Sequence, residues 1–134
     1  MMDFKKIHAW QRAHLLGIAI DTRAKGFSRK GHASLRAQIV NSASGIAATI
    51  AEGCGASTKK ELARFLEMAI KSASETEHHL LDARDFQLIS PEVWAKLSAE
   101  TIEIRKMIVV YRRKVLESID ESHVKKHTKA LRDA

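Results

Sequence analysis

The chain of 134 residues has the length of one ordinary domain, with 45% hydrophobic residues, seven aromatic positions and one proline, Pro91. It holds no run of about eighteen apolar residues, and its first residues lack the apolar core of a signal peptide, so we expect a soluble, cytoplasmic protein. The single cysteine, Cys54, cannot form an internal disulfide, which agrees with a reducing compartment.

The formal net charge is +7, and the whole excess lies in residues 1–60, which hold ten Lys and Arg against three Asp and Glu. Such asymmetry favours an anionic partner, with nucleic acid first and a membrane surface second. Many soluble proteins without nucleic-acid function are equally basic, so a solvated surface is the competing interpretation.

The first predicted helix covers about residues 5–25 and ends at the stretch "KGFSRKG". The apolar residues expected along its buried side are Ile7, Trp10, Leu15, Ile18 and Thr22.

The second predicted helix covers about residues 33–53, and its apolar stripe is Leu35, Ile39, Ser42, Ile46 and Ile50. The small side chains at 42–51 let another helix approach closely. Gly45 costs on the order of 1 kcal/mol relative to alanine, so we expect close packing or a kink there. Gly53 or Gly55 is expected to end the helix in the left-handed conformation.

The third predicted helix covers about residues 58–87, with Thr58 and Glu61 as a capping box. Its narrow seam consists of Leu62, Leu66, Ala69, Ala73, Thr76, Leu80 and Ala83. The fourth begins with Ser90 as N-cap and Pro91 at the first helical position, and we expect it to reach about Ile119. Its stripe consists of Leu97, Thr101, Ile104, Ile108, Tyr111 and Val115.

Four helices with short connections and no strand-like alternation predict an all-α fold, an antiparallel up-down-up-down four-helix bundle over residues 1–119. Residues 120–134 form a polar tail whose only sizeable apolar residues are Val124 and Leu131. The tail is either an extension of the last helix or disordered, and we expect it to fray.

Three segments carry a resemblance to a known family: F-x-x-I-x-A-W-Q-x-A at 4–13, S-x-I-A-A-T-I-A-E-G at 44–53, and E-L-A-R-F-L-E-M-A at 61–69. In order and spacing they resemble the bacterial four-helix-bundle proteins first met as open reading frames in intervening sequences of 23S rRNA genes. The resemblance runs from Phe4 to about Leu116.

The resemblance implies an up-down four-helix bundle that assembles into homopentamers. It also implies distant similarity to the accessory proteins of diversity-generating reverse transcriptases, in which a basic surface binds nucleic acid. Five copies of a chain with charge +7 would make a strongly cationic particle. We therefore predict a homo-oligomer that binds RNA or DNA, with a protein-interaction scaffold as the alternative.

The residues predicted to bind nucleic acid lie around the first connection and near the N-terminus. Lys25, Arg29, Lys30 and Arg36 come first, followed by Lys5, Lys6 and Arg12. With few aromatic residues to stack on bases, contact with the backbone of duplex or folded nucleic acid is the safer form of the hypothesis. For Arg112, Arg113 and Lys114 a solvated face is favoured, because acids flank them.

No pattern predicts a catalytic site, and we expect a non-enzyme without cofactor or metal. The G-C-G of residues 53–55 follows a helix and lacks the lysine of a phosphate-binding loop. No histidine is singled out as a base for Cys54. One E-x-x-H motif, Glu75 to His78, is present where a di-iron bundle needs two, and the "HVKKH" of residues 123–127 is assigned to the flexible tail.

Structural roles are assigned to Trp10, Glu52, Gly53, Arg64 and Phe65, which all lie within the resembling segments. Glu52 lies in the last turn of its helix, where a negative charge opposes the helix dipole. We predict that Arg64 or Lys60 neutralises it, with an exposed acid at a helix end as the equal alternative.

Overall fold

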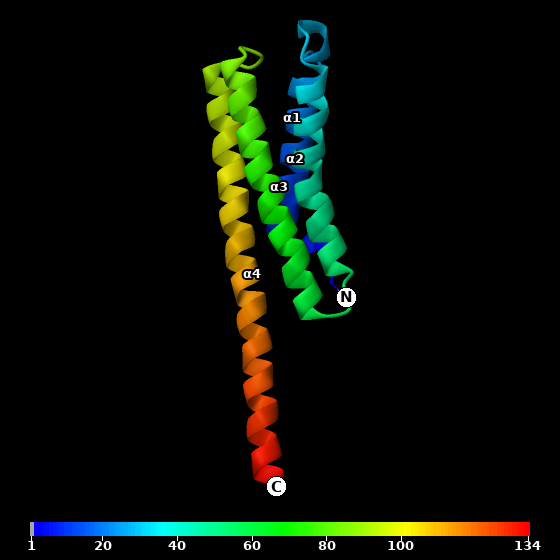
Figure 1. Ribbon diagram of the computed structural model, residues 1–134, viewed down its shortest axis with the longest axis vertical. Helices are drawn as coiled ribbons and strands as arrows, with labels where there is room; N and C mark the ends of the chain where they lie inside the picture. Colours follow the sequence, from blue (N-terminus) through cyan, green and yellow to red (C-terminus); the bar gives the residue numbers. More distant parts are fainter. Residues whose placement is uncertain (1) are drawn as a thin grey trace.

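The computed structural model describes residues 2–134, and the part it describes is helical without strands (Figure 1). Its elements are η1 Phe4–Lys6, α1 His8–Ala24, η2 Ser28–Lys30, α2 Ala33–Cys54, α3 Lys59–Asp85 and α4 Pro91–Asp133. The predicted all-α four-helix architecture is confirmed.

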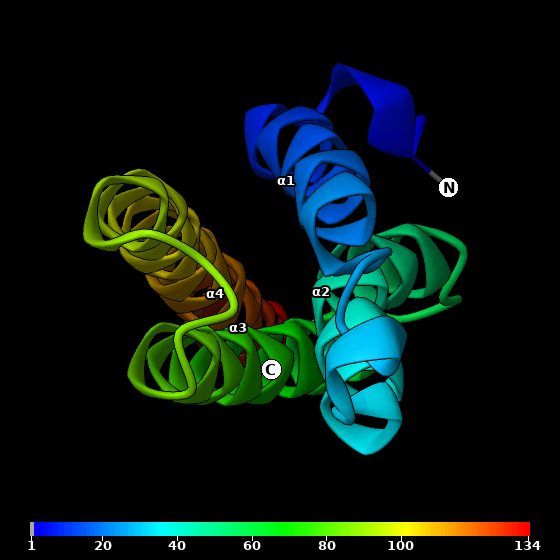
Figure 2. The same cartoon turned by 90° about the horizontal axis from the view of Figure 1, so that it is seen from above.

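The helices follow one another in space as they do in sequence. α2 packs against α1 and α3, and α3 packs against α4, while the contact between α1 and α4 is slighter. In Figure 2, α1 lies above α2, and α4 lies to the left, above α3. The connections α1–α2 and α3–α4 therefore lie at the same end of the bundle, and the α2–α3 connection lies at the other (Figure 1).

The predicted stripes of α2 and α3 form most of the core. All five stripe residues of α2 and all seven of α3 are buried. Thr76 is fully buried; its hydroxyl donates to the Ser72 carbonyl at 2.8 Å, and its Oγ1 lies within hydrogen-bonding distance of Ser42 Oγ, at 3.0 Å, so the buried hydroxyl is satisfied. From α4, the stripe residues Thr101, Ile104, Ile108 and Val115 are buried.

The predicted buried side of the first helix is wrong for Leu15, Ile18 and Thr22, which are exposed, whereas Ile7 and Trp10 are partly buried against the core. Leu15 and Ile18 are 65% and 53% exposed, and the buried residues of the helix are Ala9, Ala13, Leu16, Ile20 and Ala24. Small alanine side chains allow α1 to approach α2 closely, and a Cβ on Gly17 would lie 3.8 Å from the Ala43 carbonyl oxygen. The buried face therefore combines small residues that allow a close approach with Leu16 and Ile20, which fill the core.

The predicted helix starts at Thr58 and Ser90 are confirmed. The Glu61 amide donates to Thr58 Oγ1 at 3.1 Å, and the Val93 amide donates to Ser90 Oγ at 3.2 Å. Glu61 does not reach back to its cap, because its carboxylate accepts from Arg64 Nη2 at 2.6 Å.

The end of α2 differs from the prediction. Gly55 has a right-handed φ of −85°, and the only glycine with positive φ among residues 2–134 is Gly31, at 85°. Gly53 has a different role: a Cβ there would lie 2.9 Å from Phe65 Cβ and 3.0 Å from Leu62 Cδ1. Gly53 therefore has no room for a side chain between α2 and α3, whereas a Cβ on Gly45 would lie at an ordinary 3.4 Å from Ser72 Oγ.

α4 does not end near Ile119 but continues as a helix to Asp133. Its 43 residues correspond to a length of about 64 Å at 1.5 Å per residue. Residues 120–134 are all exposed, and Figure 1 shows them projecting past the rest of the bundle. The tail is therefore the extension of the last helix, not a frayed segment.

Candidate nucleic-acid interface

The connection between α1 and α2 is held by an internal anchor. Phe27 is 2% exposed and belongs to the core. Its carbonyl accepts from the amides of Lys30, at 3.1 Å, and His32, at 2.9 Å, and Gly31 takes the left-handed conformation that closes the turn. The cationic side chains of this connection are thus displayed from a fixed backbone.

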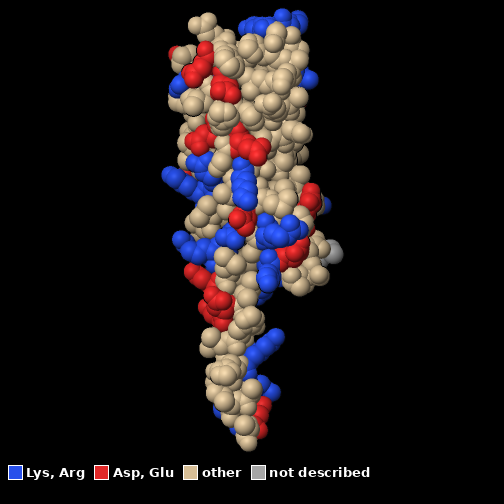
Figure 3. All heavy atoms as spheres, in the orientation of Figure 1, with Lys and Arg blue, Asp and Glu red and all other residues tan. Residues whose placement is uncertain are grey.

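The four first-choice cations come together at this end of the bundle. Lys25, Arg29 and Lys30 lie in the connection and are exposed. Arg36 lies in the first turn of α2 and is half-buried. Within residues 2–134, no carboxylate lies within 4.0 Å of any of the four. Blue atoms mark this end at the top of Figure 3.

Eight other cations are neutralised by acids. The paired residues are Arg12, Arg64, Lys71, Arg84, Arg105, Arg112, Arg113 and Lys129. The cations of the first connection therefore carry positive charge without a neighbouring acid, whereas each of these eight cations lies beside a carboxylate.

Arg36 has an additional feature. Its Nε is buried and has no hydrogen-bond partner in the described chain. A buried donor of a charged group that has no acceptor costs free energy in the free protein.

The second-choice cations do not join this cluster. Lys5 and Lys6 lie in η1, at the opposite end of α1, about 25 Å away at 1.5 Å per residue over the 17 residues of that helix. Arg12 is committed to α4: its Nε donates to Glu100 Oε2 at 3.0 Å and its Nη1 lies 3.4 Å from Met107 Sδ. The hydrogen bond to Glu100 raises the pKa of the Arg12 guanidinium.

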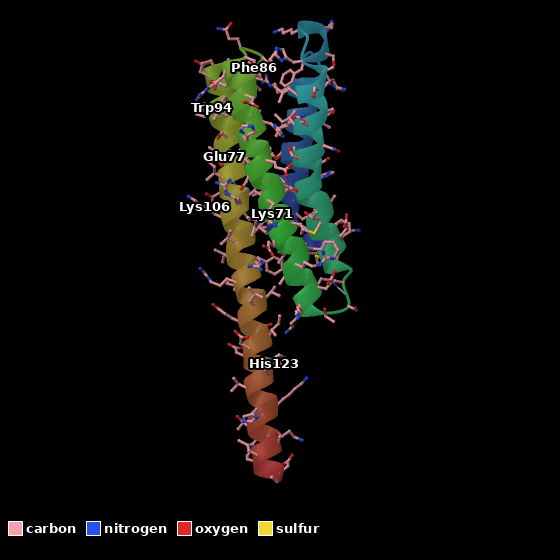
Figure 4. The ribbon with its side chains drawn as sticks, in the orientation of Figure 1. Lys71, Glu77, Phe86, Trp94, Lys106 and His123 are labelled. Carbon is pink, nitrogen blue, oxygen red and sulfur yellow. The ribbon has the colours of Figure 1, made fainter. Side chains whose placement is uncertain are left out.

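The basic residues of α4 are partly structural. Arg112 Nε donates to the Ala63 carbonyl at 3.0 Å, and Arg113 Nε lies 4.0 Å from Glu117 Oε1. Lys106 and Lys114 are exposed and have no carboxylate within 4.0 Å in the described part of the chain. Figure 4 shows Lys106 on the outer side of α4.

The predicted ion pair of Glu52 is wrong. Arg64 binds Glu61 and covers the Phe65 ring, with its Cζ 4.8 Å from the ring centroid. Glu52 is exposed and has no ion pair within residues 2–134. The alternative of an exposed acid at a helix end is correct, because solvent compensates the carboxylate without a partner.

Trp10 and Phe65 pack in the structure. The Trp10 ring meets Phe4 edge-on with centroids 4.9 Å apart and stacks on His14 at the same distance. Phe65 lies against Gly53.

Cys54 lies at the other end of the bundle, beside an open cavity of about 340 Å³. Its side chain is 2% exposed, and burial raises the pKa of the thiol. Histidine is absent from the described residues that line this cavity, so the site lacks the base that a nucleophilic thiol needs.

One group of metal-ligating side chains occurs on α3. His78, His79 and Asp82 bring one ligand atom each within 4.8 Å of one another, and His78 Nε2 lies 3.4 Å from Asp82 Oδ2. Ligands about 2.1 Å from a tetrahedral ion lie about 3.4 Å apart. The His78–Asp82 separation matches this spacing, but all three side chains come from one helix, and within residues 2–134 no ligand from a second helix joins them to complete a coordination shell.

The structure also reveals an aromatic pair that sequence patterns did not indicate. His32, after the first connection, stacks on Phe86 at the end of α3, with centroids 5.0 Å apart and planes at 21°. Both residues lie in short segments without periodicity, which is why no pattern marked them.

Comparison with known proteins agrees with the fold. Residues 5–110 match the family model of the 23S rRNA-intervening sequence protein. The chain belongs to this family. A solved structure from Bacteroides thetaiotaomicron, a protein of unknown function from the S23 ribosomal protein family, is similar with a TM-score of 0.74 and 22% identity over 78% of this chain and 95% of that one. No curated protein matches the sequence.

Neither match names a reaction. The likeness to the solved structure shows the fold alone, because the identity is 22%. Within residues 2–134, no helix is both long enough and apolar enough to cross a membrane.

Proposed function

We propose that this protein is a non-enzymatic homo-oligomer that binds structured RNA, or another nucleic acid, through the basic surface of the first connection. The observation that carries the proposal is the set of four uncompensated cations, Lys25, Arg29, Lys30 and Arg36, on a backbone fixed by Phe27. Phosphate groups supply the negative charge that would pair with these side chains. A backbone that is already fixed reduces the conformational entropy lost on binding.

Assembly of several copies would strengthen such binding. The outer side of α4 carries apolar residues at seven-residue spacing, Ala95, Ile102, Val109 and Leu116, of which Val109 and Leu116 are 44% and 37% exposed. An exposed apolar patch on a helix is typical of a surface that contacts another protein chain. Repeating the first connection in a homo-oligomer, as in the proposed pentamer, would let several phosphates be contacted at once.

Oligomer formation is tested by light scattering. A pentamer of the 15.0 kDa chain has a mass of about 75 kDa. Replacing Val109 and Leu116 by aspartate should give monomers of unchanged helicity, because it places charges in the proposed contact. Wild-type protein that is monomeric at micromolar concentration would contradict the assembly.

Nucleic-acid binding is tested with labelled ribosomal RNA hairpins and random duplex DNA. The variant K25Q/R29Q/K30Q/R36Q should lose most of its affinity. The matched control, K96Q/K106Q/K114Q/K125Q, removes the same charge from cations that also lack a carboxylate within 4.0 Å, and should bind nearly as well. Equal losses in both variants would assign binding to net charge and refute this location.

The second candidate function is a protein-interaction scaffold, favoured by the exposed Leu15 and Ile18 on α1. A scaffold should hold its partner at high salt, whereas an electrostatic nucleic-acid binder should not.

A further inference from the structure

Phe86 is a large apolar side chain held in solvent at the basic end of the bundle. It is 54% exposed, at the end of α3, and Figure 4 shows it beside the connection between α1 and α2. One face of its ring is covered by His32, whose ring is stacked on it with centroids 5.0 Å apart. The ring is therefore positioned by the first connection and remains largely open to solvent.

The backbone around Phe86 fixes its outward position. The Phe86 amide donates to the Asp82 carbonyl at 2.8 Å, and the amide of Leu88 donates to the Ala83 carbonyl at 2.9 Å. Between them Gln87 has φ +60°, the left-handed conformation that side chains other than glycine rarely adopt. Leu88 and Ile89 pack against the core, so the segment is anchored without any need to bury Phe86.

The charge of the surroundings indicates what Phe86 binds. His32 follows directly after Arg29, Lys30 and Gly31 of the basic connection. Within the α3–α4 turn itself, Arg84 is engaged with Asp85 at 2.9 Å and lies over the Trp94 ring at 4.3 Å. An exposed ring beside free cations matches a ligand that combines flat aromatic groups with negative charge, and an unpaired stretch of nucleic acid is such a ligand.

We propose that Phe86 stacks on an unpaired base and that the adjoining phosphates bind the cations of the first connection. The base would extend the existing stack on the face of Phe86 opposite His32. The inference rests on the proposed function and deepens it: the preferred substrate is RNA with an unpaired loop or end, not a continuous duplex. A ring already stacked on a neighbour loses little freedom on binding, so its contact adds to affinity.

The test compares two RNA probes with the same number of nucleotides and charges that differ by one phosphate, a hairpin with 2-aminopurine in its unpaired loop and a continuous duplex. Wild-type protein should bind the hairpin more tightly and quench the 2-aminopurine fluorescence. Phe86→Ala should weaken hairpin binding about tenfold or more and leave duplex binding within about twofold. Phe86→Trp should retain both hairpin affinity and quenching. Val124→Ala, which truncates a 65% exposed apolar residue in the tail, is the control and should change neither.

The outcomes separate this inference from the proposed function. Hairpin binding that depends on Lys25, Arg29, Lys30 and Arg36 but is unchanged by Phe86→Ala would overturn base stacking and leave the basic surface intact. Equal weakening of hairpin and duplex by Phe86→Ala would also overturn it, because the ring would then act on the fold or on a contact common to both probes. Wild-type protein that binds neither RNA would overturn both proposals.

Discussion

Substitution of Gly53 by alanine tests the close approach of α2 and α3. The added Cβ would lie 2.9 Å from Phe65 Cβ and 3.0 Å from Leu62 Cδ1. Phe65 Cβ is next to the backbone of α3 and cannot rotate away, so the helices must separate. Such overpacking costs about 1–3 kcal/mol. Removal of the glycine entropy penalty returns less than about 1 kcal/mol near a helix end. We expect a net loss of about 1–2 kcal/mol in the free energy of unfolding.

The matched control is Gly45→Ala on the same helix. There the added Cβ would lie 3.4 Å from Ser72 Oγ, an ordinary contact, so this variant should gain up to about 1 kcal/mol. Urea titration followed by circular dichroism at one protein concentration measures both, because assembly would make stability depend on concentration. Equal shifts in the same direction would refute the argument that Gly53 is required by packing.

Three further predictions concern single features of the bundle. The side chains of Arg12 and Glu100 are 38% and 34% exposed, so their ion pair is partly screened by solvent. A double-mutant cycle with glutamine at each position should give a coupling free energy of about 0.5–1 kcal/mol, which should decrease in 1 M salt. A coupling free energy that salt does not change would contradict an ion pair. Burial raises the pKa of Cys54, so iodoacetamide at pH 8 should alkylate it slowly in the folded protein and quickly in urea; rapid alkylation of the folded protein would contradict its burial. Deletion of residues 120–134, which are all exposed, should change the free energy of unfolding by less than about 0.5 kcal/mol, measured by urea titration, and a larger loss would show that the tail packs on something.

The sequence predicted best where periodic apolar residues lie between clear boundaries. The seam from Leu62 to Ala83 is buried as expected, and the predicted N-caps Thr58 and Ser90 are confirmed by their hydrogen bonds. Both signals are local, since they depend on helical spacing and on one side chain bonding a nearby amide.

The prediction failed where the sequence offers two comparable choices. On α1 it followed Leu15 and Ile18, but the buried face carries the equally apolar Leu16 and Ile20. For Arg64, two acids are close in the sequence, and it pairs with Glu61, one turn earlier on the same helix, and not with Glu52 across the connection. Choices of this kind depend on distances between elements, which spacing along the chain does not contain.

The candidate site was predicted in part. Lys25, Arg29, Lys30 and Arg36 were identified by their charge alone, and the structure adds that none of them has an acidic partner in the described chain. The stacking of Phe86 on His32 could not be predicted, because the two residues are 54 positions apart in the sequence. Their rings meet because the α1–α2 and α3–α4 connections lie at the same end of the bundle.

The measurement that tests the central claim most directly is the salt dependence of RNA hairpin binding, by fluorescence anisotropy, for wild-type protein and K25Q/R29Q/K30Q/R36Q. Each phosphate contact that is lost should reduce the slope of log K against log salt concentration by about 0.7–0.9. The account predicts a steep wild-type slope that falls by about three units in the variant and stays within one unit in K96Q/K106Q/K114Q/K125Q. A slope that is shallow in the wild type, or unchanged in the variant, would contradict a nucleic-acid interface at the first connection.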